Sequence, residues 1–323
     1  MTQPPPPAPS TPRTVTGRAP TRLDFGGGWT DVPPYSSTVG GYVCNVAIAR
    51  HATVTLTAAD PATEPDGSPD SPLAAAALRR AGLPSVGAAI RSDFPVGAGL
   101  GGSSAVGVAL AAAIARWRGE PLDPAALAER SREVEVEECG IAGGRQDHYA
   151  AAFGGPLGLR FLPGDRVEVR RIALDERTRR ELEARCVVAY TGEARISAAT
   201  IEGVLGQVRR GDERVTRTLA AMARLAERMA DRLAAGDLDG LGRLVGEQWT
   251  LQRSLHPAIP TARIDRLLHA AAAAGALGGK ALGASGGGCV MAIAAADRVD
   301  RVRQALSDGA ELLEYEVDEV GVR

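Results

Sequence analysis

A glycine-dense loop that leads straight into an alanine-rich run is the feature that most constrains this chain. The loop reads PVGAGLGGSSA over residues 95–105, and helical periodicity follows from Ser104 to Arg118. Glycines allow backbone N–H groups to turn toward an anion, and a helix N-terminus places partial positive charge behind them. The loop therefore suits a polyphosphate, although a glycine turn that only begins a helix would look the same. Neither a Walker A lysine nor the Rossmann glycine spacing is present.

Composition restricts the kind of protein that carries this loop. The chain has 323 residues, 45% of them hydrophobic and 24% charged, which is typical of a soluble globular protein with two modest domains. A net charge of −2 gives no electrostatic basis for binding nucleic acid or an anionic membrane. No apolar run is long enough to span a membrane, and no hydrophobic signal segment begins the chain. Four separated cysteines predict buried thiols in a reducing compartment without a zinc site, so we expect a cytoplasmic protein.

Patterning divides the chain into three parts. Residues 1–13 hold six prolines and predict a disordered leader, and residues 60–72 predict a polar surface loop. A change of domain near residues 173–184 predicts an N-terminal domain over 14–178 and a C-terminal domain over 179–323. The predicted strands cover 43–48, 51–57, 88–93, 167–172, 186–190, 290–294 and 311–317. The predicted helices cover 73–81, 104–118, 123–138, 197–235 with a break at Gly211 and Asp212, 238–254, 264–274 and 297–308.

A second motif lies near the N-terminus, where three glycines precede Trp29, Thr30 and Asp31. A carboxylate beside an aromatic ring suits a sugar, because the carboxylate accepts hydrogen bonds from hydroxyls and the ring covers an apolar face. The same residues would also form a simple turn in which Asp31 caps the local backbone.

An acidic segment and a second glycine-framed loop come after the phosphate loop. Residues 133–138 read EVEVEE, and residues 143–149 read GGRQDHY. Clustered glutamates at a helix end are commonly a solvated face, whereas Asp147 is expected on a loop constrained by glycines. One carboxylate could bind magnesium while the other addresses an acceptor hydroxyl. A third glycine cluster, KALGASGGGCV over residues 280–290, could close over phosphates or simply connect a helix to a strand.

Together, the four motifs resemble the sugar-kinase branch of the GHMP kinase superfamily over essentially residues 14–323. Within that branch, the chain is most similar to the D-glycero-D-manno-heptose 7-phosphate 1-kinases in the motifs FGGGWTDxPPY, GGxQDxYAAxFGG and YTGxxR. Fucokinase domains share many of the same motif residues. The resemblance implies a two-domain α+β fold. Its parts are an N-terminal ribosomal-protein-S5-domain-2-like α/β domain and a C-terminal ferredoxin-like α+β domain, with the active site in the cleft.

The resemblance also implies a role for individual residues. Asp147 matches the catalytic aspartate, and Arg22 occupies the basic position beside it. Ser104 and Glu135 match the magnesium ligands, with Glu137 and Glu138 as alternatives to Glu135. The residues matching the ATP phosphate loop are Pro95, Gly97, Gly99, Leu100, Gly101, Gly102, Ser103 and Ser104. The residues expected to bind substrate are Gly28, Trp29, Thr30, Asp31, Gly144, Arg145, Gln146, Tyr190, Thr191, Gly192, Arg195, Lys280, Gly286 and Gly287.

The implied activity is transfer of phosphate from ATP, with Mg²⁺, to the anomeric hydroxyl of a sugar phosphate such as a heptose 7-phosphate or an octose 8-phosphate. Arg195 and Lys280 are favoured for the substrate phosphate, because Arg195 belongs to YTGxxR and Lys280 is the only lysine. A kinase of a free sugar such as fucose, and a catalytically silent sugar sensor derived from a kinase, are the alternatives. The expected partner is a small molecule, with the chain a monomer or homodimer.

Three positions depart from the family pattern. Gly102 stands where relatives often have serine, His148 replaces the usual glutamine, and Cys289 replaces a common phenylalanine. We expect neither His148 nor Cys289 to touch the catalytic groups, although both could reshape the sugar pocket.

Overall fold

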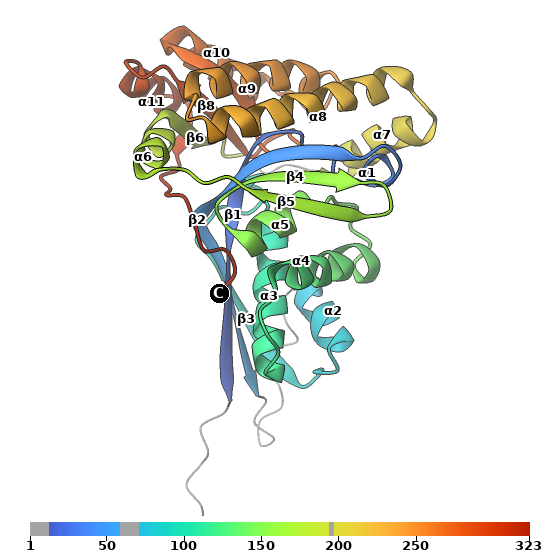
Figure 1. The fold of residues 1–323 in the computed structure, drawn as a ribbon. Helices are drawn as coiled ribbons and strands as arrows, with labels where there is room; N and C mark the ends of the chain where they lie inside the picture. Colours follow the sequence, from blue (N-terminus) through green and yellow to red (C-terminus); the bar gives the residue numbers. More distant parts are fainter. Residues whose placement is uncertain (1–12, 59–70, 194–196) are drawn as a thin grey trace, which may run out of the picture.

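The computed structural model describes residues 13–58, 71–193 and 197–323, so the predicted leader, most of the predicted surface loop and Arg195 lie outside the described residues. An antiparallel five-stranded sheet organises the first half (Figure 1), with the order β1-β2-β4-β5 and β3 paired to β2. The two strands predicted over 43–48 and 51–57 form one long strand, because β2 pairs with β4 near its start and with β3 near its end. The strands are β1 (Thr14–Gly26), β2 (Gly41–Ala58), β3 (Val86–Ser92), β4 (Pro156–Leu162) and β5 (Arg166–Arg171).

Among the described residues, the first half has three helices where the sequence predicts them and two, over 35–38 and 146–153, that it did not predict. Asp123 caps α4, accepting a hydrogen bond from the backbone N–H of Ala126 at 2.8 Å, and Pro124 occupies the first helical position. The helix predicted over 123–138 changes at Val134 into a π-helical turn that ends at Glu138. The α-helices are α1 (Tyr35–Thr38), α2 (Pro72–Arg80), α3 (Gly102–Arg118), α4 (Pro124–Glu133) and α5 (Gln146–Phe153).

The second half contains a four-stranded antiparallel sheet of order β7-β8-β6-β9 with helices packed against it. Strand β7 occupies a segment that the sequence left unassigned, and only two residues of the predicted 311–317 strand join the sheet. The elements are α6 (Glu176–Arg185), β6 (Cys186–Tyr190), α7 (Ser197–Arg209), α8 (Glu213–Ala234), α9 (Leu238–Arg253), α10 (Ala262–Ala274), β7 (Ala276–Ala281), β8 (Cys289–Ala294), α11 (Val299–Ser307) and β9 (Glu311–Leu312). Among the described helices, none has the length and apolar character needed to cross a bilayer.

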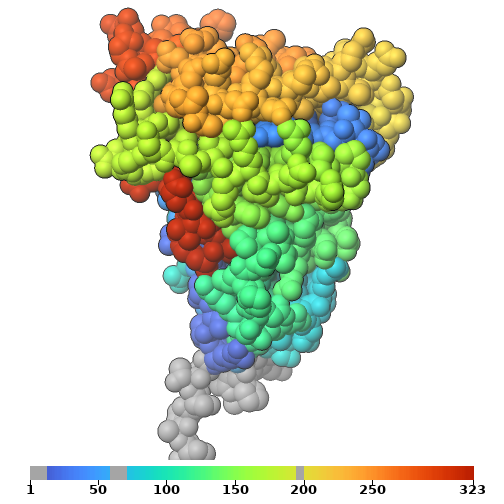
Figure 2. All heavy atoms as spheres, viewed as in Figure 1, coloured from blue at the N-terminus to red at the C-terminus, as the bar shows by residue number. Residues whose placement is uncertain are grey.

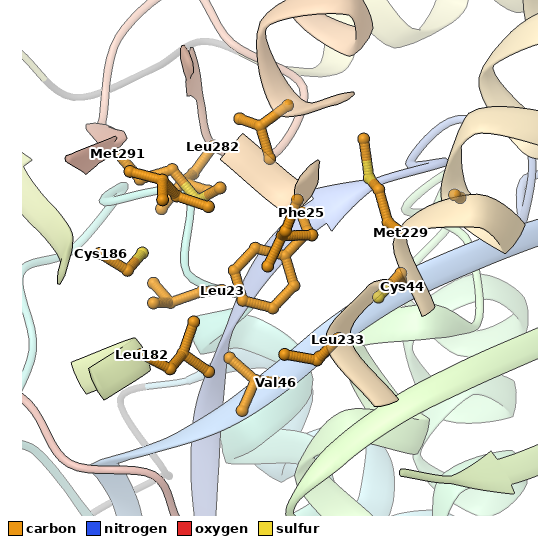
Figure 3. Close-up of a cluster of buried hydrophobic side chains, with 14 of the residues drawn as sticks. Leu23, Phe25, Cys44, Val46, Leu182, Cys186, Met229, Leu233, Leu282 and Met291 are labelled. Atoms are coloured by element: carbon orange, nitrogen blue, oxygen red, sulfur yellow. The ribbon is translucent and has the colours of Figure 1, made fainter. Parts of the chain in front are cut away.

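A shared hydrophobic core joins the two sheets. Helices α3 and α5 pack on one face of the first sheet and α8 packs on the other (Figure 1). On β2, Cys44 and Val46 point toward α8, as expected when alternate residues of a strand face the same side. Figure 3 shows the cluster to which they belong: Met229 from α8 lies beside Cys44, and Met291 from β8 in the second sheet lies across the cluster, next to Leu282. The core therefore holds the two halves in a defined relation, which positions any site between them.

The C-terminal segment returns to the first half of the molecule. Val317 forms a bridge with Ile48, and Arg323 exchanges two backbone hydrogen bonds with Arg18. Figure 2 shows this segment in dark red, lying against the surface of the first half. The last residues of the expected C-terminal domain thus pack on the N-terminal sheet.

Three of the four cysteines are buried as predicted, and Cys139 is partly exposed. All four are free thiols.

Candidate active site

A cavity of about 480 Å³ brings together residues from all four motifs, of which the first and last, Arg22 and Ala284, are 262 positions apart in the sequence. This volume lies within the range of small-molecule sites, roughly 300–1,000 Å³. Ile201 and Glu202 of α7, which no motif contained, also line it. The motif residues in its wall are Arg22, Gly28, Trp29, Asp31, Gly101, Gly102, Ser103, Ser104, Glu135, Gly143, Gly144, Gln146, Asp147, Gly283 and Ala284.

The phosphate loop is held in place by the chain around it. Gly101 has a φ of 73°, in the left-handed region that favours glycine, and α3 begins at the next residue. The first N–H groups of a helix have no partner within it, so this turn presents free donors to the cavity. Behind the loop, Leu100 accepts a hydrogen bond from the backbone of Arg22 at 3.0 Å, and Ala98 accepts one from Cys289 at 2.7 Å.

The loop also borders a second cavity of about 310 Å³, which shares Gly101, Gly102 and Ser103 with the first. Its wall includes the predicted loop residues Pro95, Gly97, Gly99 and Leu100. A Cβ atom on Gly102 would lie 2.5 Å from the ring of Phe94. Phe94 thus occupies the space that a side chain at position 102 would need.

Asp147 lies beside the phosphate loop and is paired with Arg22. The guanidinium donates from Nε to Oδ1 at 2.8 Å and from Nη2 to Oδ2 at 2.9 Å, and Nη1 donates to the carbonyl of Gly99 at 2.6 Å. Arg22 is buried, whereas the Asp147 side chain is 22% exposed toward the cavity. The expectation of a loop position for Asp147 is wrong, because this residue stands in the first turn of α5.

Glu135 reaches the same cavity from the π-helical turn. Its Oε1 accepts a hydrogen bond from Oγ of Ser103 at 2.6 Å, and its Oε2 lies 2.8 Å from Nε2 of His148. Burial opposes the charged form, but these hydrogen bonds outweigh it and hold the pKa of Glu135 below its ordinary value. The alternatives, Glu137 and Glu138, instead accept hydrogen bonds from Arg80 and do not line the cavity.

His148 contacts the two residues that the resemblance matches to the magnesium ligands. Its Nε2 lies 2.8 Å from Oε2 of Glu135 and 3.3 Å from Oγ of Ser104. The helical spacing explains the contact, because His148 is buried against α3 and α4 while Asp147 faces the cavity. No periodicity in the sequence could have indicated which neighbour the imidazole would meet.

Asp31 and its neighbours form a wall of the cavity with unused hydrogen-bonding atoms. Oδ2 of Asp31 accepts a hydrogen bond from the backbone N–H of Gln146 at 3.0 Å. Among the residues that line this cavity, three buried side-chain atoms have no partner within the described residues: Oδ1 of Asp31, Nε1 of Trp29 and Oε1 of Gln146. Burial raises the pKa of Asp31 to about 7. Such unpaired groups are costly to bury and suit a polyhydroxylated ligand that would pair with them.

Two predicted substrate-binding cations lie away from the cavity. Nζ of Lys280 donates to Oδ2 of Asp24 at 2.8 Å and to the Asp24 carbonyl at 2.9 Å, with both side chains fully enclosed. Arg145 donates to Glu129 and Asp165 and does not line the cavity. Each cation is therefore satisfied by carboxylates of the chain, and we assign neither of them to substrate.

The remaining predicted positions have structural contacts. Thr30 donates to the carbonyl of Gly27 at 2.7 Å, and Thr191 donates to the carbonyl of Gly288 at 2.7 Å. Gly286 donates its N–H to Ile259. Tyr190, Thr191, Gly192, Gly286 and Gly287 are absent from the cavity wall, and Arg195 lies outside the described residues.

Ser104 and Glu135 are the groups best suited to a divalent cation. The described residues contain no cluster of three or more His, Cys, Asp or Glu side chains that could hold a metal. Mg²⁺ usually takes one or two protein oxygens and completes its octahedron with water and substrate phosphates. A hydroxyl and an ionised carboxylate beside a phosphate loop fit that requirement.

Comparison with known families places the chain among kinases. The model described as GHMP kinases N terminal domain matches residues 72–155, and the one described as GHMP kinases C terminal matches residues 229–311. The D-glycero-alpha-D-manno-heptose 7-phosphate kinase of Campylobacter jejuni is 29% identical over 300 residues, covering 85% of this chain and 88% of that protein.

Two further similarities extend over nearly the whole chain. A solved D-glycero-D-manno-heptose 1-phosphate kinase from Bacteroides thetaiotaomicron has a TM-score of 0.76 at 25% identity, covering 96% of this chain and 98% of that one. The bifunctional fucokinase/GDP-fucose pyrophosphorylase of Arabidopsis thaliana is 26% identical over 336 residues, covering 93% of this chain and 32% of that longer protein.

Proposed function

The chain belongs to the GHMP kinase family, and from that premise we propose that it transfers the terminal phosphate of ATP to the anomeric hydroxyl of a sugar phosphate. The observation that carries the proposal is the bidentate pair between Arg22 and Asp147, which lies in the cavity wall beside the first turn of α3. A carboxylate, a guanidinium and a phosphate loop within one small cavity match the needs of phosphoryl transfer.

Phosphoryl transfer requires positioning and charge neutralisation more than covalent chemistry. Asp147 would accept or orient the proton of the attacking hydroxyl, and Arg22 fixes the plane of that carboxylate through two hydrogen bonds. An anomeric hydroxyl is more acidic than an ordinary alcohol, so a carboxylate is a sufficient base. The N–H groups of the Gly101–Ser104 turn would hold the phosphates of the nucleotide.

Mg²⁺ would be held by Ser104 and Glu135, and it would supply neutralisation of phosphate charge when bound. Because hydrogen bonds lower the pKa of Glu135, this carboxylate is already charged at neutral pH and oriented before any cation arrives.

The sugar is proposed to lie against Asp31, Trp29 and Gln146. Their unpaired buried atoms offer acceptors and a donor for hydroxyl groups, and the Trp29 ring supplies an apolar surface. The relatives of heptose-phosphate type favour a heptose 7-phosphate or a related octose 8-phosphate as acceptor.

A free sugar such as fucose is the second candidate, and one observation favours it. Among the described residues of the cavity wall, Arg22 is the sole cation, and it is committed to Asp147. Arg195, which lies outside the described residues, remains our proposed contact for a phosphate on the sugar. A coupled ADP-release assay over matched pairs of free and terminally phosphorylated sugars separates the two candidates. Equal turnover of both members of a pair would refute the sugar-phosphate proposal.

Asp147→Asn tests the chemical role directly. We expect kcat to fall by about 10²- to 10⁴-fold, the usual contribution of a general base, while ADP affinity changes little. Asp231→Asn is a matched control, because Asp231 also pairs with an arginine but lies on the surface of α8. Turnover close to that of wild type in Asp147→Asn would remove this residue from the proposed role.

A further inference from the structure

His148 connects three helices at the edge of the cavity. It follows Asp147 in α5 and is 1% exposed. Nε2 lies 2.8 Å from Oε2 of Glu135 and 3.3 Å from Oγ of Ser104, while Nδ1 lies 2.9 Å from Oγ of Ser131. One imidazole thus links the first turn of α3, the end of α4 with its π-helical turn, and α5. Helices α3, α4 and α5 pack together below the first sheet (Figure 1).

The direction of the central hydrogen bond follows from the chemistry of the partners. An ionised carboxylate only accepts hydrogen bonds, so Nε2 of His148 carries the hydrogen that joins it to Glu135. The other oxygen of Glu135 accepts from Ser103 at 2.6 Å. Both carboxylate oxygens are therefore held by donors of the chain, and each retains a lone pair that a cation could use.

We propose that His148 is a positioning residue, which orients Glu135 and Ser104 for the divalent cation that accompanies the nucleotide. The inference rests on the proposed function, because Ser104 and Glu135 are metal ligands only in that proposal. A hydrogen bond to a ligating carboxylate restricts its orientations before the metal binds, and loss of such a partner typically costs about 10- to 100-fold in metal affinity or activity.

The position of His148 in α5 also links it to the proposed base, Asp147. Asp147 and His148 are neighbours in one helical turn, with Asp147 facing the cavity and His148 facing α3 and α4. A shift of His148 would therefore move the proposed base and the proposed metal ligands together. A glutamine, which the resemblance leads us to expect here, also carries an N–H donor on a side chain of similar reach. The requirement is for a donor to Glu135 rather than for an imidazole.

Calorimetric titration with ADP, in Mg²⁺ and in EDTA, tests this role without turnover. The measured quantity is the ratio of the two ADP affinities, which isolates the contribution of the metal. His148→Asn retains a polar group toward Ser131 but is too short to reach Glu135, and His148→Gln restores a donor. His269→Asn is the control, because His269 is exposed on α10.

We expect the same ratio of ADP affinities in wild type, His148→Gln and His269→Asn. In His148→Asn we expect a ratio that is smaller by about tenfold or more. Affinity in EDTA should be equal in all four proteins, which a general loss of structure would not allow. A wild-type ratio in His148→Asn would overturn the inference. A wild type whose ADP affinity ignores Mg²⁺ would instead refute the metal site of the proposed function, and the inference with it. If His148→Asn does not fold, a reduced ratio in Ser131→Ala supports the positioning role and an unchanged ratio contradicts it.

Discussion

Removing the ammonium group of Lys280 should reveal the energetic weight of the ion pair that joins the two halves of the molecule. Lys280 of β7 and Asp24 of β1 are 0% and 1% exposed. Within the described residues, the lysine is the sole hydrogen-bond partner of the Asp24 carboxylate, whose Oδ1 has none. Lys280→Met keeps most of the side-chain volume and leaves that carboxylate uncompensated. A buried charge without a partner becomes protonated rather than staying charged.

The cost can be worked out from that protonation. Protonating a carboxyl group of ordinary pKa at pH 7 costs about 4 kcal/mol, because each unit by which the pH exceeds that pKa contributes about 1.4 kcal/mol. This agrees with the roughly 3–5 kcal/mol lost when one member of a buried pair is removed. At pH 5 the same step requires only about 1.5 kcal/mol. The destabilisation by Lys280→Met should therefore be large at pH 7 and much smaller at pH 5.

Urea unfolding at the two pH values, followed by tryptophan fluorescence, measures this difference. The double variant Asp24→Asn/Lys280→Met removes both charges and should recover most of the lost stability. Arg180→Met, which breaks an exposed pair with Glu176, is the control and should change the urea midpoint little at either pH. A loss that is the same at pH 5 and pH 7, or a double variant no more stable than Lys280→Met, would refute the reasoning.

The other predictions concern the cavity wall around Asp31, against which we propose that the sugar lies. Burial raises the pKa of Asp31 to about 7, so folding takes up a proton there and wild-type stability falls as the pH rises from about 4 to 7. Asp31→Asn has no such group to titrate. The difference in unfolding free energy between Asp31→Asn and wild type, measured in urea, should therefore shift in favour of the variant by about 3 kcal/mol from pH 5 to pH 8. The same difference at both pH values would contradict the raised pKa of Asp31. A Cβ atom on Gly144 would lie 1.8 Å from Oδ2 of Asp31, so Gly144→Ala should displace that carboxylate and raise the KM for the sugar about 10- to 100-fold, as expected for losing one hydrogen bond to a charged group. Gly143→Ala is the matched control, because its nearest atom is 3.7 Å away, and equal KM values in the two variants would argue against a sugar contact at Asp31.

Much of the fold was accessible from local patterns. The predicted family and the two-part α+β architecture are confirmed, and the strand predicted over 186–190 has those bounds. The start of a helix could be predicted where an aspartate precedes a proline, as at Asp123. Strand β7 escaped prediction because its glycines weaken any strand signal. Those glycines serve packing, since a Cβ atom on Gly278 would lie 2.0 Å from the carbonyl of Gly242 in α9.

The side chains that carry charge were predicted less well than the elements. Arg145 and Lys280 stood in motif loops and suited a phosphate, yet both are paired with carboxylates of the chain. His148 was expected to matter only for the shape of the sugar pocket, and it instead contacts Glu135 and Ser104, the two residues matched to the magnesium ligands. In each case the deciding partner comes from another element, and no local pattern encodes such a pairing.

The sequence by itself determined what depends on the backbone and on spacing. The glycines of residues 97–102 and the hydroxyls after them favour an anion-binding loop, and the resemblance to the family implies a catalytic role for the acid at 147. Only the tertiary structure decided which charges remain available to a ligand. Lys280 meets Asp24 across 256 positions of the chain, and Glu135 rather than Glu137 or Glu138 reaches the cavity. The physical reason is that burial and pairing set the cost of a charge, and both depend on contacts between distant segments.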